Sequence, residues 1–224
     1  MLRFLMLFIC SLLSFMAQAE IEAYNRVDFQ IEATRDVSND LLVASMSADI
    51  QDKRPAEVAQ QLGTRLNEAL RQAASFSSIR TSSGNQHTTP VYGKNNQITG
   101  WHGHGEIHLE SRDFKAAGEL IMQLQSTLQL SGVQFTLAPD SRLQIENALL
   151  TEAIKAFQSR AEAIRAALGA KSYKTVHFAI NSAPQHYPMQ MMRSMNADES
   201  IPAQQFAGGE SRMTVQINGT IELQ

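Results

Sequence analysis

Histidine and glutamate recur at every second position in one short stretch of the chain. The residues are His102, His104, Glu106 and His108, separated by Gly103, Gly105 and Ile107. Every second side chain of a β-strand points to the same face, so these four side chains would share one face. Neutral imidazoles that lie this close together suit zinc, copper or nickel, and Glu106 would serve as an oxygen ligand or as an orienting group.

A polar turn at residues 93–96 predicts that residues 79–92 and 97–112 form a hairpin. If Tyr92 pairs with Gln97, His87 lies opposite His102. The metal-site hypothesis therefore takes its ligands from four histidines: His87, His102, His104 and His108. The alternative is an ordinary solvent-facing strand surface, because Trp101, Ile107 and Leu109 alternate onto the opposite face.

A methionine run is the second group that could bind a metal. It consists of Met189, Met191, Met192 and Met195, next to His186 and Tyr187. Thioethers are soft ligands that select Cu(I). The alternatives are oxidisable surface groups, a flexible loop that contacts a partner, and apolar filling in an assembly.

Motifs for catalysis are missing from the sequence. There is no G-x-S-x-G elbow, His104 and His108 do not form an H-E-x-x-H motif, and the carboxylates are scattered. We therefore expect a protein that is not an enzyme and has no cofactor. Zinc or copper bound by the histidines or methionines is the alternative.

The N-terminal residues have the pattern of a cleavable signal peptide. Arg3 precedes an apolar run at residues 5–15, and Ala17-Gln18-Ala19 is a small-x-small cleavage site. We expect cleavage after Ala19 and a periplasmic mature chain of residues 20–224. Cys10 is the one cysteine of the sequence and lies in the leader, so the mature chain can form no disulfide.

The charge of the chain excludes some partners. It has 19 Lys and Arg residues against 22 Asp and Glu residues, a net charge of −3 at pH 7. No basic block favours nucleic acid, and no apolar run after the leader reaches membrane length. We expect a chain that binds no nucleic acid and has no transmembrane segment after signal cleavage.

Apolar periodicity divides the mature chain into strands and helices. Strands are expected at residues 24–31, 41–50, 79–92, 97–112, 133–137, 175–180 and 212–223. Helices are expected from Pro55 to Ala73, from 114 to 124 and from 142 to 168. The buried stripe of the last helix is expected at Ile145, Leu149, Ala153, Ala156, Ile164 and Leu168.

This order predicts an α+β fold, a mainly antiparallel sheet with helices packed on one face. Residues 41–138 follow the β-α-β-β-α-β order of a ferredoxin-like split β-α-β unit. Residues 139–224 would hold the long helix, the closing strands and a loop at 181–209. A loop of that length is either functional or mobile.

Several motifs, taken in order, resemble the SIMPL domain family, which includes the YggE-like exported stress proteins. They are Val37-Ser38-Asn39-Asp40, Ser78-Ile79-Arg80-Thr81 with Pro90-Val91-Tyr92, Ile98-Thr99-Gly100-Trp101, Asp113 with Gly118, Phe135 with Leu137, and the helix at 153–169. The resemblance covers residues 20–224. Asn39 departs from it, because the family usually has proline there.

The resemblance implies an exported or periplasmic α+β domain that forms homo-oligomers and is associated with oxidative or envelope stress. It brings no agreed catalytic residues, so no residue of this chain inherits a catalytic role. Self-assembly or binding is the function that the sequence favours, and the ligand is left open.

Overall fold

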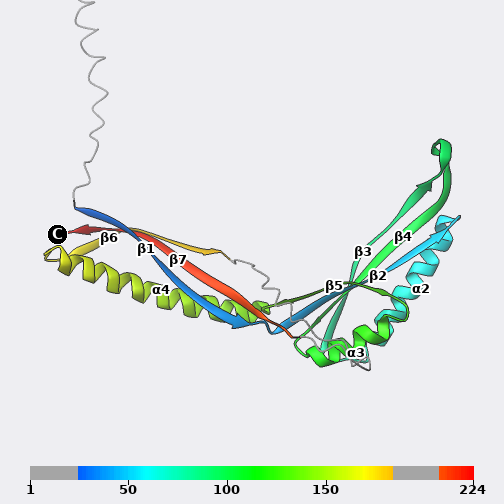
Figure 1. The fold of residues 1–224 in the computed structure, drawn as a ribbon, viewed down its shortest axis with the longest axis horizontal. Helices are drawn as coiled ribbons and strands as arrows, with labels where there is room; N and C mark the ends of the chain where they lie inside the picture. The colour runs from blue at the N-terminus through cyan, green and yellow to red at the C-terminus, as the bar shows by residue number, and fades with distance from the viewer. Residues whose placement is uncertain (1–24, 184–206) are drawn as a thin grey trace, which may run out of the picture. The chain divides into compact units, whose positions relative to one another are not determined.

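The structure is a computed structural model that describes residues 25–183 and 207–224. Its strands are β1 (Arg26–Ser38), β2 (Leu41–Asp52), β3 (Ile79–Tyr92), β4 (Ile98–Ser111), β5 (Gln129–Thr136), β6 (Tyr173–Ala183) and β7 (Glu210–Leu223). Its helices are α2 (Pro55–Ala73), α3 (Phe114–Leu124) and α4 (Pro139–Ala167), with a short 3-10 turn, η1 (Lys94–Asn96). The α+β class is confirmed (Figure 1).

The described chain divides into two compact units. One comprises residues 25–31, 154–181 and 217–224, and the other comprises residues 32–153, 182–183 and 207–216. The strands form a three-stranded sheet with the order β1-β7-β6 and a four-stranded sheet with the order β3-β4-β2-β5. Within the described residues, no helix is long and apolar enough to span a membrane.

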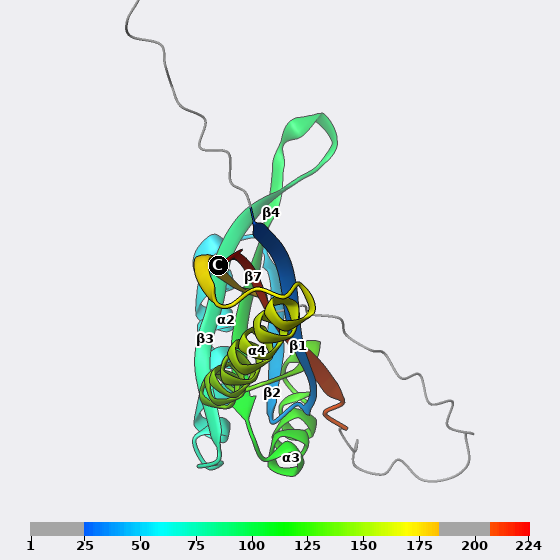
Figure 2. The same ribbon diagram turned by 90° about the vertical axis from the view of Figure 1, so that its left-hand side faces the viewer.

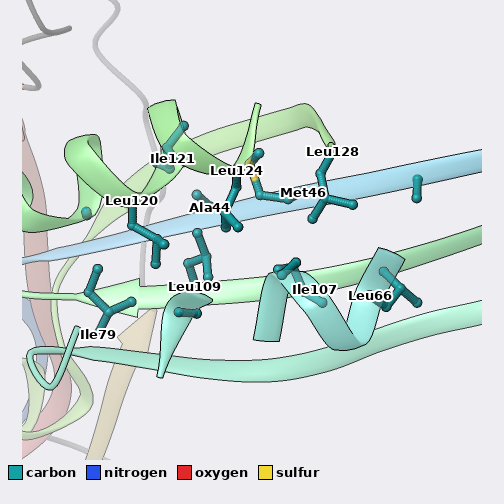
Figure 3. Close-up of a cluster of buried hydrophobic side chains, with 14 of the residues drawn as sticks. Ala44, Met46, Leu66, Ile79, Ile107, Leu109, Leu120, Ile121, Leu124 and Leu128 are labelled. Atoms are coloured by element: carbon teal, nitrogen blue, oxygen red, sulfur yellow. The ribbon is translucent and has the colours of Figure 1, made fainter. Parts of the chain in front are cut away.

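The four-stranded sheet is antiparallel, and α2 and α3 lie against the same face of it (Figure 1). On β2 this face carries Ala44, Met46, Ala48 and Ile50, which are all buried. They pack with Leu62 and Leu66 of α2, Leu120 and Leu124 of α3, and Ile107 and Leu109 of β4 (Figure 3). The residues of β4 that alternate with the buried ones point to the opposite face, and they include His102, His104 and His108.

The β3–β4 hairpin continues past the end of β2 (Figure 2). The last β2–β4 pair is Asp52 with Trp101, whereas the hairpin pairs on to Tyr92 with Ile98. Its turn contains Asn95 and Asn96 in the left-handed region, at φ 69° and 58°. Asparagine tolerates that conformation better than most residues do, so the expected polar turn is confirmed at 93–97.

In the first unit, α4 packs on the three-stranded sheet through Phe157. Its ring stacks on Phe29 of β1, with ring centroids 4.6 Å apart, and meets Phe178 of β6 edge-on at 5.1 Å. The ring lies directly over Gly219 of β7, where an added Cβ would come within 2.3 Å of Phe157 Cε2. Glycine at this position therefore lets the helix approach the middle strand.

Some expected boundaries and burial assignments are wrong. β1 continues to Ser38 instead of ending at 31, and β5 begins at Gln129 and runs through Gly132. α4 begins at Pro139 instead of 142, because Asp40 Oδ1 accepts the Ala138 N–H at 2.7 Å and satisfies a backbone donor there.

The stripe of α4 and the long loop also differ from expectation. Leu168 lies just beyond α4 and is 63% exposed, whereas the buried positions recur every four residues. Those positions are Leu149, Ala153, Phe157 and Ala161. The expected loop 181–209 is shorter at its start, since β6 ends at Ala183, whereas its expected end agrees with the start of β7 at Glu210. Residues 184–206 lie outside the described chain.

Asn39 joins the start of β2 to the residues before β7. Its backbone N–H donates to the Gly209 carbonyl at 3.0 Å, and its Nδ2 donates to the Gly208 carbonyl at 2.8 Å. Its Oδ1 accepts a hydrogen bond from the Ser211 hydroxyl at 2.6 Å. Proline has no backbone N–H and could make none of these bonds. The departure from the usual family residue therefore has a structural use in this chain.

Two glycines of β4 allow α2 to lie directly on the sheet. A Cβ built on Gly103 would come within 2.4 Å of Val58 Cγ1, and one built on Gly105 within 2.8 Å of Leu66 Cδ1. Val58 is fully buried and β-branched, so it has little freedom to move aside. The small residues between the histidines are therefore the positions that face the helix.

Replacing Gly103 with alanine should destabilise the protein by about 1–3 kcal/mol, because the new methyl group overlaps Val58. Gly132→Ala in β5 is the matched control, since nothing lies within 4 Å of its added Cβ. The control should be neutral or stabilising by up to about 1 kcal/mol. Urea unfolding of the two variants tests this, and equal effects would contradict the close packing of α2 on β4.

Candidate functional site

Two histidines of β4 converge on one carboxylate of β2. Asp49 pairs with His104 in the antiparallel register, and Gln51 pairs with His102. Asp49 Oδ1 lies 3.0 Å from His104 Nδ1 and 3.0 Å from His102 Nε2. The side chains of Asp49, His102 and His104 are 38%, 31% and 23% exposed, so water and small ions reach them. Asp49 Oδ1 is thus in contact with one imidazole nitrogen of His102 and one of His104.

The second ring nitrogen of His104 faces another carboxylate. His104 Nε2 lies 3.0 Å from Glu106 Oε1, two residues along the same strand. An ionised carboxylate can only accept hydrogen bonds, so His104 donates from both nitrogens only as an imidazolium. The arrangement Asp49–His104–Glu106 therefore stabilises the protonated form of His104.

Both carboxylates influence the proton affinity of His104. Hydrogen bonds to Glu106 and Asp49 raise the pKa of His104 above 6.5, its ordinary value, and desolvation opposes them. The hydrogen bond from His104 lowers the pKa of Asp49 below 3.8. At pH values between the lowered pKa of Asp49 and the raised pKa of His104, a negative carboxylate on β2 faces a positive imidazolium on β4.

The structure places His87 opposite His104, and the expected pairing with His102 is wrong. The hairpin pairs Tyr92 with Ile98 instead of Gln97, and an irregularity between Val91 and Tyr92 shifts the register again. The rings of His87 and His104 are 5.4 Å apart between centroids and tilted by 40°. His87 therefore lies next to the pair of histidines that share Asp49.

His108 lies apart from this group. Its Nδ1 is 3.0 Å from Ser45 Oγ on β2, and its Nε2 lies under the irregular part of β3, where an added Gly84 Cβ would be 2.6 Å away. Ser45 and His108 are directly paired residues of β2 and β4, so this hydrogen bond is a cross-strand contact. His108 is thus a structural neighbour of the cluster of Asp49, His102 and His104.

The structure does not contain a preformed metal site among its described residues. No three or more His, Cys, Asp and Glu side chains in residues 25–183 and 207–224 are arranged to hold an ion. The methionine run, Met189, Met191, Met192 and Met195, lies outside the described residues. Both metal-ligand predictions therefore stay predictions.

Two surface hollows of the described chain lie away from the histidines. One, of about 600 Å³, lies on α2 and is lined by Thr64, Asn67, Leu70, Arg71 and Ala74. Another, of about 510 Å³, is lined by residues that include Leu41, Leu137, Arg142 and Glu146. The side chains of His102, His104 and Asp49 are partly exposed on their sheet face.

Asp49 is the residue that the sequence did not indicate. It lies in phase with Ser45 and Ser47 on β2, while Ala44, Met46 and Ala48 are buried on the other face. Its alternation with buried residues assigns it to the open face. Its role appears only when β2 is known to pair with β4.

Removing the titrating group of His104 should make stability less dependent on pH. His104 has a raised pKa, so its contribution to the free energy of unfolding is full below about pH 6.5 and is lost as pH rises through the raised pKa. Asp49 has a lowered pKa, so its contribution is full above about pH 3.8 and is lost as pH falls through the lowered pKa.

His104→Gln should therefore cost most stability between about pH 4 and 6.5, by about 1 kcal/mol or less because water screens this partly exposed group. Urea unfolding from pH 4 to 9, in the presence of a chelator, measures the difference. Glu106→Gln removes one carboxylate and should move the high-pH loss to lower pH. A difference between wild type and His104→Gln that is the same at pH 5.5 and pH 8.5 would contradict the network.

Comparison with known proteins gives a family and no activity. A crystal structure described as AtUAH in complex with glyoxylate is similar at 14% identity and a TM-score of 0.24, covering 50% of this chain and 29% of that chain. A structural likeness this low supports no conclusion about the fold or the function of this chain. No curated protein sequence matches the chain. The family described as SIMPL, protein of unknown function (DUF541), matches residues 27–221, nearly the whole chain. The chain therefore belongs to the SIMPL family.

Proposed function

We propose that this SIMPL protein is exported to the periplasm and acts without catalysis, by self-assembly, in envelope or oxidative stress defence. The leader pattern at residues 1–19 supports export. The stress role rests on the family resemblance. The observation that carries self-assembly is the outer strand of the three-stranded sheet, β6.

β6 lies at an edge of its sheet and exposes a row of apolar side chains. Val176, Phe178 and Ile180 are 43%, 38% and 46% exposed, and they alternate along the strand, so they share one face. Within the described chain, β7 is the strand that pairs with β6, and no strand pairs with its outer edge. An apolar strand with unpaired backbone groups is a template for another strand.

The other edge of this sheet is protected by charge. β1 carries five charged residues: Arg26, Asp28, Glu32, Arg35 and Asp36. β6 carries Lys174 and one histidine, His177. Charged side chains on an edge strand oppose pairing with another chain, so β6 is the edge on which association is favoured.

The partner that fits β6 is β6 of a second copy. Two antiparallel copies related by a twofold axis would exchange backbone hydrogen bonds, and their apolar rows would lie next to each other. Such a contact would satisfy the unpaired backbone groups of the β6 edge and would also cover Val176 and Ile180. It also closes after two copies, although further contacts could build a larger assembly.

The double variant Val176→Lys/Ile180→Lys should prevent this association, because two adjacent copies would bring like charges together. Phe178 is left unchanged, since it packs against Phe157. Sedimentation at micromolar concentration should give a dimer or larger species for the mature wild type and a monomer for the double variant.

Met122→Lys/Leu143→Lys is the matched control, because these exposed apolar residues, at 52% and 58%, lie on α3 and α4 instead of β6. The control should assemble as wild type does. A monomeric wild type, or a double variant that still assembles, would refute assembly through β6.

Export predicts a mature N-terminus at Glu20. Protein isolated from the periplasmic fraction should begin there by N-terminal sequencing. Replacing Ala17 and Ala19 with arginine should block cleavage, because the cleavage site needs small residues. A native protein that begins at Met1 and fractionates with the cytosol would refute export and leave assembly to be judged separately.

A further inference from the structure

We propose that the end of the β3–β4 hairpin binds the headgroup surface of an anionic phospholipid bilayer. The contact would use the arm, residues 90–101, which is the part of the hairpin beyond the last β2–β4 pair, Asp52 with Trp101. The proposal adds a peripheral membrane contact to the proposed function, and it does not depend on assembly through β6.

The arm carries an apolar stripe along one face. Pro90 pairs with Trp101, and Tyr92 pairs with Ile98. Directly paired residues share a face of an antiparallel ribbon, and so do residues two apart on one strand, so all of these side chains lie on the same face. Trp101 packs against the buried core. The stripe therefore continues the core face of the sheet outward along the hairpin.

The outer part of the stripe is open to solvent. Tyr92 is 56% exposed and Ile98 is 52% exposed. They lie on a projecting ribbon (Figure 2), so they cannot enclose a small molecule. A bilayer surface adapts to a convex shape, and tyrosine and tryptophan are suited to the headgroup level, where one end of the ring is in apolar surroundings and the other is hydrated.

The charge of the hairpin fits an anionic surface. Within residues 81–105, Lys94 is the one Lys, Arg, Asp or Glu, and it lies in the turn at the tip. At the base of the arm, Asp52 Oδ1 accepts the backbone N–H of Arg54 at 2.9 Å, and Glu57 Oε1 lies 2.9 Å from Arg54 Nη2. The tip thus presents a cation and no carboxylate, although the whole chain has a net charge of −3. Apolar area and attraction to anionic lipids together determine binding at a membrane surface.

A strand of a second copy fits the arm less well than a bilayer does. β3 is an edge strand, but Pro90 has no N–H to donate, and the pairing is irregular between Ser83 and Gln86. Proline and bulges on an edge strand oppose pairing with another chain. The turn also exposes residues 94–97, whose polar groups stay hydrated among headgroups but would need matched partners in a protein pocket.

Vesicle flotation of the mature protein tests the contact, with vesicles of phosphatidylcholine alone and of phosphatidylcholine mixed with phosphatidylglycerol. Wild type should float with the mixed vesicles and much less with the neutral ones. Tyr92→Ser/Ile98→Ser should weaken binding at least about tenfold, because it removes the exposed part of the stripe. Lys94→Gln should weaken binding to the mixed vesicles about fivefold, because it removes the cation at the tip.

Trp101 provides a second measurement, because it is the one tryptophan of the chain and lies at the base of the stripe. Its fluorescence emission should shift to shorter wavelength when mixed vesicles are added to wild type. The emission of Tyr92→Ser/Ile98→Ser should stay unchanged.

Met122→Ser/Leu143→Ser is the matched control, because these residues are 52% and 58% exposed but lie on α3 and α4, and it should float as wild type does. Melting curves show whether each variant folds. A wild type that does not float, or a Tyr92→Ser/Ile98→Ser variant that floats as well as the control, would overturn the proposal. Loss of self-association by that variant in sedimentation without vesicles would also overturn it, because the stripe would then be a contact between copies.

Discussion

The packing of α2 on the glycines of β4 is the constraint on which the four-stranded unit depends. Gly103 and Gly105 face the helix, and these positions need glycine because any larger side chain would overlap Val58 or Leu66. The intervening residues must then point to the other face of the sheet. The same alternation that builds the core therefore gathers His102, His104 and Glu106 where β2 presents Asp49. Core packing and the polar cluster are two consequences of one strand orientation.

In the other unit, a glycine again lets a helix pack closely on a strand. Gly219 lies under the Phe157 ring, and this lets α4 settle on β7 while Phe29 and Phe178 flank the ring. The helix covers the sheet incompletely at its outer strand, where Val176 and Ile180 stay exposed. One sheet thus exposes a polar, ion-pairing face, and the other exposes an apolar edge.

Much of this could be predicted from the sequence, where local patterns determine the outcome. The α+β class, the helices and the shared face of His102 and His104 follow from periodicity. The partner of these histidines does not, because Asp49 is more than fifty residues away along the chain and its role requires β2 to lie beside β4. The position of His87 also could not be predicted, since strand irregularities shift the hairpin register. Alternation along a strand determines which face of the sheet a side chain points to. The register and the order of the strands determine which side chains it contacts.

The most direct test of the central claim is a proton NMR measurement of contacts across β4. The account predicts nuclear Overhauser effects between the Gly103 Hα protons and the Val58 methyl groups, while the ring protons of His104 show none to Val58 or Leu62. A shift of one residue in strand register would move every side chain to the opposite face. Contacts between the His104 ring and the α2 methyl groups would therefore contradict both the packing and the cluster built on it.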